Sequence, residues 1–166
     1  MYDKYLHSFD KHQYIHTVEI NNLQELADVY YSLNEKYFIE GLVMEPVMGE
    51  GNPGIPLHPL FYKLARKITR ENNTNLIIDS VQAGLRTTGY LSIVDYPGFE
   101  SLESPDMEIF SKAISSGHYP LSVLAMQDHI ANIYEIGTYG NTMCANPKAL
   151  DVGFETLARL TPKVSS

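Results

Sequence analysis

Hydrophobic residues follow two different spacings along the 166-residue chain, and the two alternate. In the stretch 22–38 they recur every three or four positions behind Asn22, the spacing of an amphipathic helix that begins at a cap residue. The same spacing predicts a second helix from about Pro59, with basic residues on its outer side, and a third helix over about 146–160.

Short, nearly continuous apolar runs lie before, between and after the helical patterns. They read GLVMEP, NLIID, MEIF and PLSVLAM, and each is bounded by residues typical of turns. Strands that alternate with helices indicate right-handed crossover connections and a sheet that is mostly parallel. The sequence therefore predicts an α/β fold, a mostly parallel sheet with flanking helices, in one globular unit.

Composition and charge narrow the range of functions. A hydrophobic share of 44% is enough for a single core, and a formal net charge of −8 argues against a surface for nucleic acid or anionic membranes. We therefore expect the partner to be a small molecule or another protein. The single cysteine, Cys144, rules out a disulfide within the chain. With no membrane-length apolar run and no signal-peptide pattern at the N-terminus, a cytoplasmic location is expected.

Two residues with complementary chemistry follow two of the predicted strands. Asp79 ends the run NLIID, and Lys112 comes just after MEIF. Ligands of open α/β sheets bind at the carboxyl ends of the strands, where a Schiff-base lysine and a carboxylate partner would belong. Two simpler interpretations stay open, because many such lysines are solvated surface residues and many such aspartates only cap the next turn.

Other candidate residues carry a weaker signal. Glu45 and Glu50 lie in a loop rich in glycine and proline, and they could form a carboxylate pair for acid–base work. The six histidines lack metal-ligand spacing, and only His118 lies near the predicted site, so structural or surface roles are expected and no metal. Cys144 has no recognisable basic partner, which argues against a nucleophile.

Four motifs occur in an order that is similar to one known family. They are GLVMEPVMGEG, LIIDSVQAGLRTTG, FSKAISSGHYPLSVLAM and GTYGNTMCANP, which together with their surroundings span roughly residues 17–160. The stretch resembles the class III, fold-type I aminotransferases that use pyridoxal 5′-phosphate, and the ornithine aminotransferase branch looks nearest. The resemblance implies transfer of an amino group from an amino acid or ω-amine to a 2-oxo acid.

The resemblance also implies roles for individual residues. Lys112 matches the lysine that binds the cofactor as an internal aldimine and moves the substrate proton, and Asp79 matches the aspartate that pairs with the pyridine nitrogen. Val81 matches the apolar side chain on the ring face, and Gln82 matches the residue that hydrogen-bonds the phenolic oxygen.

Two further matches concern the rim of the site. Thr138 in GTYGN matches a threonine that reaches the cofactor phosphate of a neighbouring subunit, which implies a homodimer. Glu50 in GEG matches a glutamate near the substrate side chain. Ser80 stands where the family commonly has Glu, Arg86 is displaced by one position, and NTMCANP is longer than the family's usual segment.

The chain resembles only the second half of the family's large, cofactor-binding domain. We expect the N-terminal half of that domain and the C-terminal small domain to be absent from these 166 residues, so the chain is a fragment or a subunit of the complete enzyme. The alternative is a non-catalytic structural or interaction remnant of the fold. An aminomutase, racemase or decarboxylase also stays open, because a fold does not fix a reaction.

Overall fold

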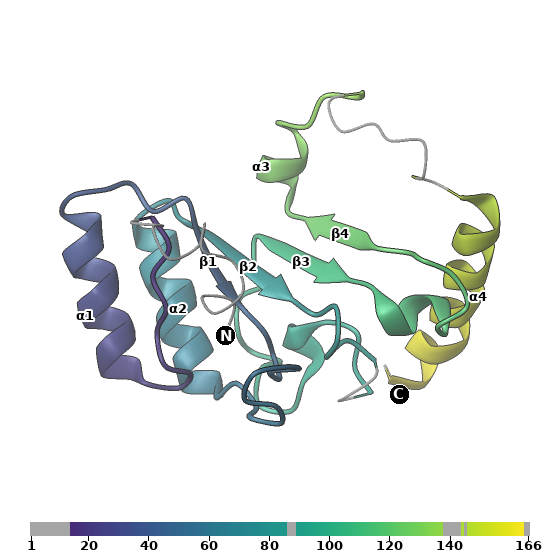
Figure 1. Cartoon of the computed structure of the whole chain (residues 1–166), viewed down its shortest axis with the longest axis horizontal. Helices are drawn as coiled ribbons and strands as arrows, with labels where there is room; N and C mark the ends of the chain where they lie inside the picture. The colour runs from purple at the N-terminus through teal and green to yellow at the C-terminus, as the bar shows by residue number, and fades with distance from the viewer. Residues whose placement is uncertain (1–13, 86–88, 138–143, 145, 165–166) are drawn as a thin grey trace.

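The computed structural model describes residues 14–85, 89–137, 144 and 146–164. It contains the expected helices and strands, together with two 3-10 turns and the short helix α3, which the sequence pattern did not predict (Figure 1). In chain order the elements are α1 (Leu23–Asn34), β1 (Gly41–Met44), α2 (Pro59–Glu71), β2 (Asn75–Asp79), η2 (Ile93–Asp95), β3 (Met107–Phe110), η3 (Lys112–Ser115), β4 (Val123–Met126), α3 (Asp128–Ala131) and α4 (Pro147–Val164).

The two helices next to β1 begin where the sequence predicted. Asn22 caps α1, because its side chain accepts a hydrogen bond of 3.1 Å from the backbone amide of Glu25. Pro59 is the first residue of α2, where its missing amide hydrogen costs nothing, and the His58 side chain accepts from the amide of Leu60. Local sequence signals thus set where both helices begin.

The four strands form one sheet in the order β1-β2-β3-β4. β1, β2 and β3 are mutually parallel, and Asp79 at the end of β2 is in register with Ile109 of β3. β4 runs antiparallel to β3, because the chain reverses after η3. The expected mostly parallel sheet is confirmed, and its carboxyl edge holds the ends of β2 and β3 side by side.

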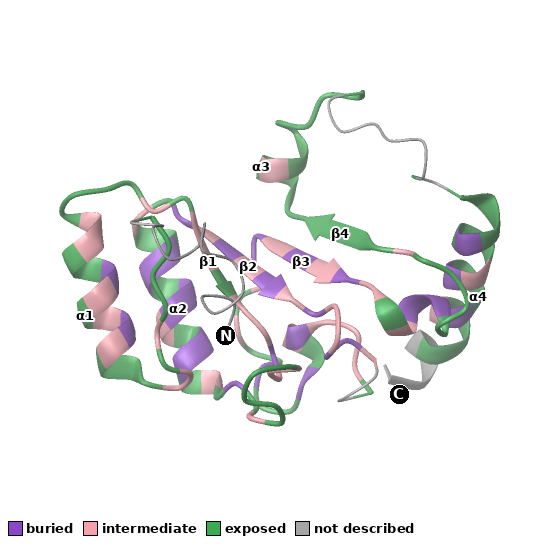
Figure 2. Ribbon diagram, in the orientation of Figure 1, coloured by how far each residue is buried: buried purple, intermediate pink, exposed green. Residues whose placement is uncertain are grey.

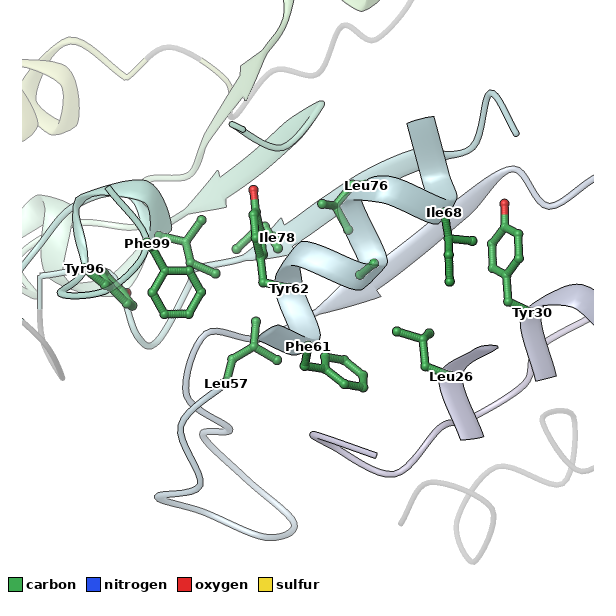
Figure 3. Packing of buried hydrophobic residues seen from close by; sticks show 12 residues of the cluster. Leu26, Tyr30, Leu57, Phe61, Tyr62, Ile68, Leu76, Ile78, Tyr96 and Phe99 are labelled. Carbon is green, nitrogen blue, oxygen red and sulfur yellow. The ribbon is translucent and has the colours of Figure 1, made fainter. Parts of the chain in front are cut away.

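One face of the sheet is covered by α1, α2 and the segment around η2 (Figure 3). Leu76 and Ile78 of β2 point to this covered face and are fully buried against Tyr62 and Ile68 of α2. Leu26 and Tyr30 extend the cluster onto α1. Each such side chain contributes about 1.5–3 kcal/mol when it is removed from water, so this cluster is the main source of stability.

The opposite face, here called the open face, carries the alternate residues of the strands. Its apolar side chains are partly or largely exposed: Val43 is 61% exposed and Leu124 is 47% exposed, and all of β4 is exposed (Figure 2). The residues of the open face are Val43, Ile77, Asp79, Met107, Ile109, Leu124 and Met126. Parallel sheets are normally covered on both faces, so the open face is a surface suited to burial against further structure.

A buried ion pair joins the covering helix to the strands. Arg66 of α2 lies 2.8 Å from Asp106, and the same carboxylate oxygen accepts a 2.7 Å hydrogen bond from the backbone amide of Leu76. His129 reaches the other oxygen at 3.5 Å. Because Asp106 directly precedes β3, this pair sets the position of β3 relative to α2 and β2.

Candidate functional site

Asp79 ends β2 on the open face and is half-buried. Its Oδ1 accepts a 3.0 Å hydrogen bond from the amide of Val81, so the aspartate does cap the turn that follows. Among the described residues, none donates a hydrogen bond to the second oxygen, Oδ2. The capping interpretation is therefore correct, and it leaves one carboxylate oxygen available for a ligand.

Lys112 lies at the end of the neighbouring strand, as predicted. It is the first residue of η3, its side chain is exposed, and its Nζ donates a hydrogen bond to Oε1 of Gln82. Its backbone φ is +46°, a left-handed conformation that a residue with a side chain seldom adopts. Such conformations are concentrated at functional sites, and the contact with Gln82 distinguishes this lysine from a freely solvated surface residue.

Gln82 connects three loops at the carboxyl edge. Besides accepting from Lys112, it donates through Nε2 to the carbonyl oxygen of Gly49 at 3.3 Å, and the amide of Gly49 donates to Glu45 at 3.0 Å. There is no room for a side chain at position 49, because a Cβ on Gly49 would come within 2.7 Å of the Gln82 amide group. The loops after β1, β2 and β3 are thus joined at one point, next to the lysine.

Hydroxyl groups hold the loop that follows Lys112. Ser115 is buried and donates to the carbonyl of Tyr119 at 2.7 Å, and Ser111 donates to the carbonyl of Leu121 at 2.6 Å. The sequence analysis did not single out either serine. The serine-rich segment FSKAISSG suggested that hydroxyl groups are available near Lys112. Which backbone groups they contact depends on the path of the loop.

Helix α4 supports the same loop from outside (Figure 1). The hydroxyl oxygens of Ser116 and Thr156 lie 3.0 Å apart. Gly153 lets the helix approach closely, because a Cβ at this position would lie 2.5 Å from the Leu121 side chain. The backbone that presents Lys112 is therefore supported by a packed helix.

The remaining predicted residues differ in how the structure places them. Val81 is half-buried two residues after Asp79, and Glu50 is exposed in the loop after β1. The Glu45 carboxylate accepts a hydrogen bond from the amide of Gly49. Thr138 lies outside the described residues, as does Arg86.

Glu108 is a buried carboxylate that the sequence analysis missed. It lies in the middle of MEIF, on the covered face, and is only 4% exposed. Desolvation raises the pKa of its carboxyl above the usual value, although hydrogen bonds from Ser80, Ser92 and Ile93 act in the opposite direction. A glutamate inside an otherwise apolar strand is the signal that could have drawn attention to it.

Two hollows in the described part of the chain can be compared with the predicted site. One, of about 700 Å³, is lined by the Lys112 loop and includes His118 and Tyr119. The other, of about 630 Å³, lies between α1 and the start of β1 and contains none of the predicted site residues. Lys112 lines the first hollow, whereas Asp79 and Gln82 line neither of the two.

Two other kinds of functional feature are absent from the described ranges. No group of three or more His, Cys, Asp or Glu side chains there could hold a metal ion. Of the helices formed by those residues, none combines the length and the apolar character needed to cross a membrane.

The fold matches that of a known family of enzymes. The family model described as aminotransferase class-III matches residues 6–163, and the chain belongs to this family. It shares with solved members the fold-type I architecture of a mostly parallel sheet with flanking helices. The resemblance inferred from the four motifs is confirmed.

Among curated relatives, the acetylornithine aminotransferase of Clostridium acetobutylicum is 32% identical over 160 residues, which cover 96% of this chain and 39% of that protein. An ornithine aminotransferase of Bacillus cereus is 33% identical over 115 residues, 69% of this chain and 28% of that protein. The chain therefore spans well under half the length of the relatives that it matches.

Solved structures of aminotransferases also match this chain over about a third of their own length. An ornithine aminotransferase from Toxoplasma gondii, described with partial occupancy of PLP at its active site, superposes with a TM-score of 0.73 at 27% identity, over 88% of this chain and 32% of that one. An acetylornithine aminotransferase from Elizabethkingia anophelis superposes with a TM-score of 0.74 at 27% identity, over 88% of this chain and 36% of that one.

Proposed function

We propose that the protein carrying this chain is a pyridoxal 5′-phosphate-dependent aminotransferase that moves an amino group from an amino acid or ω-amine to a 2-oxo acid. The observation that carries the proposal is that Asp79 ends β2 beside the parallel strand β3, while Lys112, which follows β3, donates a hydrogen bond to Gln82 in the turn after β2. Membership of the class III family and similarity to ornithine and acetylornithine aminotransferases support it.

The donor set at this edge fits the cofactor. Lys112 supplies a primary amine on an exposed side chain that donates a hydrogen bond to Gln82. Asp79 has one carboxylate oxygen engaged with its own turn, and the other accepts no hydrogen bond from the described residues. An aldehyde needs the first group and a protonated ring nitrogen needs the second, so the two residues match the two ends of a pyridoxal ring.

Asp79, Lys112 and Gln82 would hold pyridoxal phosphate at this edge, where the cofactor would supply an electron sink for the substrate carbon that loses its proton. Asp79 keeps a proton on the ring nitrogen, because a carboxylate beside a basic nitrogen favours its charged form. Lys112 holds the cofactor through its amine and then carries the proton at Nζ. Gln82 orients Nζ and offers its amide group to the phenolic oxygen, and Val81 packs against the ring.

The residues at the rim complete the proposed site. Glu50 lies on the substrate side, and Thr138 reaches the cofactor phosphate across the interface of a homodimer. Because the chain spans about a third of the relatives' length, the preceding half of the large domain and the small domain are supplied by polypeptide outside these 166 residues. The open apolar face of the sheet supports this, since such a face requires cover.

Covalent labelling tests the proposal. The protein, in the length in which it is expressed, is mixed with pyridoxal 5′-phosphate and reduced with borohydride, and its intact mass and peptides are then measured. We expect one cofactor per chain, attached at Lys112. The matched control is Lys63→Ala, which removes an exposed lysine of α2 and should leave labelling unchanged.

Labelling scattered over surface lysines, or none, would contradict the proposal and favour a non-catalytic remnant of the fold. If Lys112 is labelled, product analysis with several amino donors decides between transamination and an aminomutase, racemase or decarboxylase reaction. New amino acid formed from an added 2-oxo acid is the result expected of the aminotransferase.

A further inference from the structure

Glu108 joins three segments of the chain under the carboxyl edge of the sheet. Its Oε1 accepts a 2.6 Å hydrogen bond from the Ser80 hydroxyl and a 3.1 Å bond from the Ile93 amide, and its Oε2 accepts a 2.7 Å bond from the Ser92 hydroxyl. Glu108 and Ser80 are each at most 4% exposed. The three donors come from two other parts of the chain, Ser80 after β2 and Ser92 and Ile93 at the start of η2, so the carboxylate forms a bridge between these segments and β3.

The bridge ends at the residue next to Asp79. Ser80 is held at three points, since its hydroxyl donates to Glu108, its amide donates to the Ile109 carbonyl at 2.9 Å and its carbonyl accepts from the Gly84 amide at 2.9 Å. Adjacent residues of a strand point to opposite faces. Fixing Ser80 toward the covered face therefore fixes Asp79 toward the open one.

The turn that follows depends on the same anchor. Gly84 approaches Ser80 so closely that a Cβ on Gly84 would lie 2.8 Å from the Ser80 carbonyl oxygen. Gln82 lies inside this turn and receives the Lys112 hydrogen bond. The orientation of Gln82, like that of Asp79, is thus set by a turn whose first residue is tied to Glu108.

Simple filling of the core does not require a carboxylate here. Ile78 pairs with Glu108 in register and fills the covered face with an apolar side chain, at lower desolvation cost. A buried carboxylate that is fully hydrogen-bonded contributes geometric definition rather than net stability.

We propose that Glu108 is a positioning residue, whose bridge to Ser80 and Ser92 holds the turn that presents Asp79 and Gln82 to the cofactor. This inference rests on the proposed function, because it assumes that pyridoxal phosphate binds at Asp79 and Lys112. It assigns to a residue on the covered face an effect on a ligand bound at the open face.

The test compares two substitutions at one position. Glu108→Gln keeps an oxygen for Ser80 and Ile93 and places an amide that can donate to the Ser92 hydroxyl, so the bridge persists. Glu108→Met keeps the length of the side chain and removes the bridge. Affinity for pyridoxal phosphate is measured by absorbance titration, and the absorbance of the bound cofactor is followed as a function of pH.

We expect Glu108→Met to weaken cofactor binding about 10-fold or more and to shift the pH dependence of the cofactor absorbance, because the partner of the ring nitrogen is no longer held in place. Glu108→Gln should stay within about 3-fold of the unmodified protein. Ser80→Ala, which removes one arm of the bridge, should weaken binding in the same direction.

Tyr30→Phe is the matched control for a purely structural effect. It also removes a buried hydrogen bond on the covered face, the 2.5 Å contact with Thr74, but it lies away from Asp79. It should lower thermal stability without changing cofactor affinity or the pH profile. A change in affinity that follows thermal stability across all the variants would overturn the inference.

The failure of this inference can be distinguished from failure of the proposed function. If the unmodified protein is not labelled at Lys112, the proposed function and the role of Glu108 are both refuted. If it is labelled and folded Glu108→Met binds cofactor like the unmodified protein, only the role of Glu108 is refuted. Should Glu108→Met not fold, Ser80→Ala decides, and unchanged affinity in that variant refutes the role.

Discussion

The two faces of the sheet are made from alternate residues of the same strands, yet they differ in what they do. The covered face packs Leu76 and Ile78 against two helices and holds the stability of the chain. The open face is formed by the alternate positions of the same strands, and it carries exposed apolar residues together with Asp79. The difference shows that in this chain the residues that provide stability and the residue proposed for chemistry are separated by a single step along a strand.

The largest effect is expected at the carboxyl edge. Lys112→Ala should abolish covalent attachment of pyridoxal phosphate and reduce turnover by about 10³-fold or more, since it removes both the attachment point and the proton carrier. The side chain is exposed and the new residue keeps a Cβ, so thermal stability should hardly change. Peptide mapping after borohydride reduction checks the site. Stoichiometric attachment at another lysine would contradict the assignment.

Asp79→Ala should have the second-largest effect on turnover, a loss of about 10²–10³-fold, because the ring nitrogen loses its charged partner. Cofactor affinity should fall as well, while Lys112 remains available for attachment. Steady-state kinetics at saturating cofactor and an absorbance titration measure the two effects separately. Glu50→Ala is the comparison, because Glu50 is exposed and is proposed to lie on the substrate side, and it should change KM for the amino donor more than cofactor affinity.

A pair of substitutions tests directly whether the two faces of the sheet contribute differently to stability. In the 166-residue chain, Ile78→Ala should cost about 2–5 kcal/mol of unfolding free energy, because it leaves a cavity in the covered face. Val43→Ala on the open face should stay within about 0.5 kcal/mol. Urea titrations measure both. A cost for Val43→Ala close to that for Ile78→Ala would show that the open face is already buried, for example in a self-associated form.

The smallest expected effect concerns pH. Burial raises the folded-state pKa of Glu108, so folding favours its protonated form, and this contribution to stability is present below the unfolded pKa and is lost as pH rises through the folded pKa. The charged neighbour Asp95 acts in the same direction. Relative to the unmodified chain, Glu108→Gln should therefore gain stability as pH rises from about 4 to neutral. Urea midpoints across this range, taken as the difference between the two proteins, test it, and a difference that does not change with pH would contradict it.

Local patterns predicted much of the fold. The cap at Asn22, Pro59 at the start of α2, and the apolar runs of β1, β2 and β3 all act over a few residues, and each element formed where its pattern occurs. The spacing of Asp79 and Lys112 after two such runs also predicted their meeting at one edge. The short helix α3 had no comparable hydrophobic period and was missed.

Contacts between distant segments could not be read in this way. Nothing in the sequence pairs Glu108 with Ser80 and Ser92, or Gln82 with Lys112, because these contacts span 28, 16 and 30 positions. Ser80 was noted only as a departure from the family pattern, whereas the structure places its hydroxyl on a buried carboxylate. The Glu45–Glu50 hypothesis likewise depended on a loop path, and the path directs Glu45 to the amide of Gly49.

The sequence alone determined the three longer helices, the four strands, the family and the residue types that could carry the chemistry, because hydrophobic period, capping and motif spacing are properties of short segments. Only the tertiary structure decided which face of each strand is covered, how Gln82 reaches Lys112, and that Glu108 anchors the turn after Asp79. Those features arise when the strands align in register and bring distant backbone together, and the energy of a buried hydrogen bond exists only after that alignment.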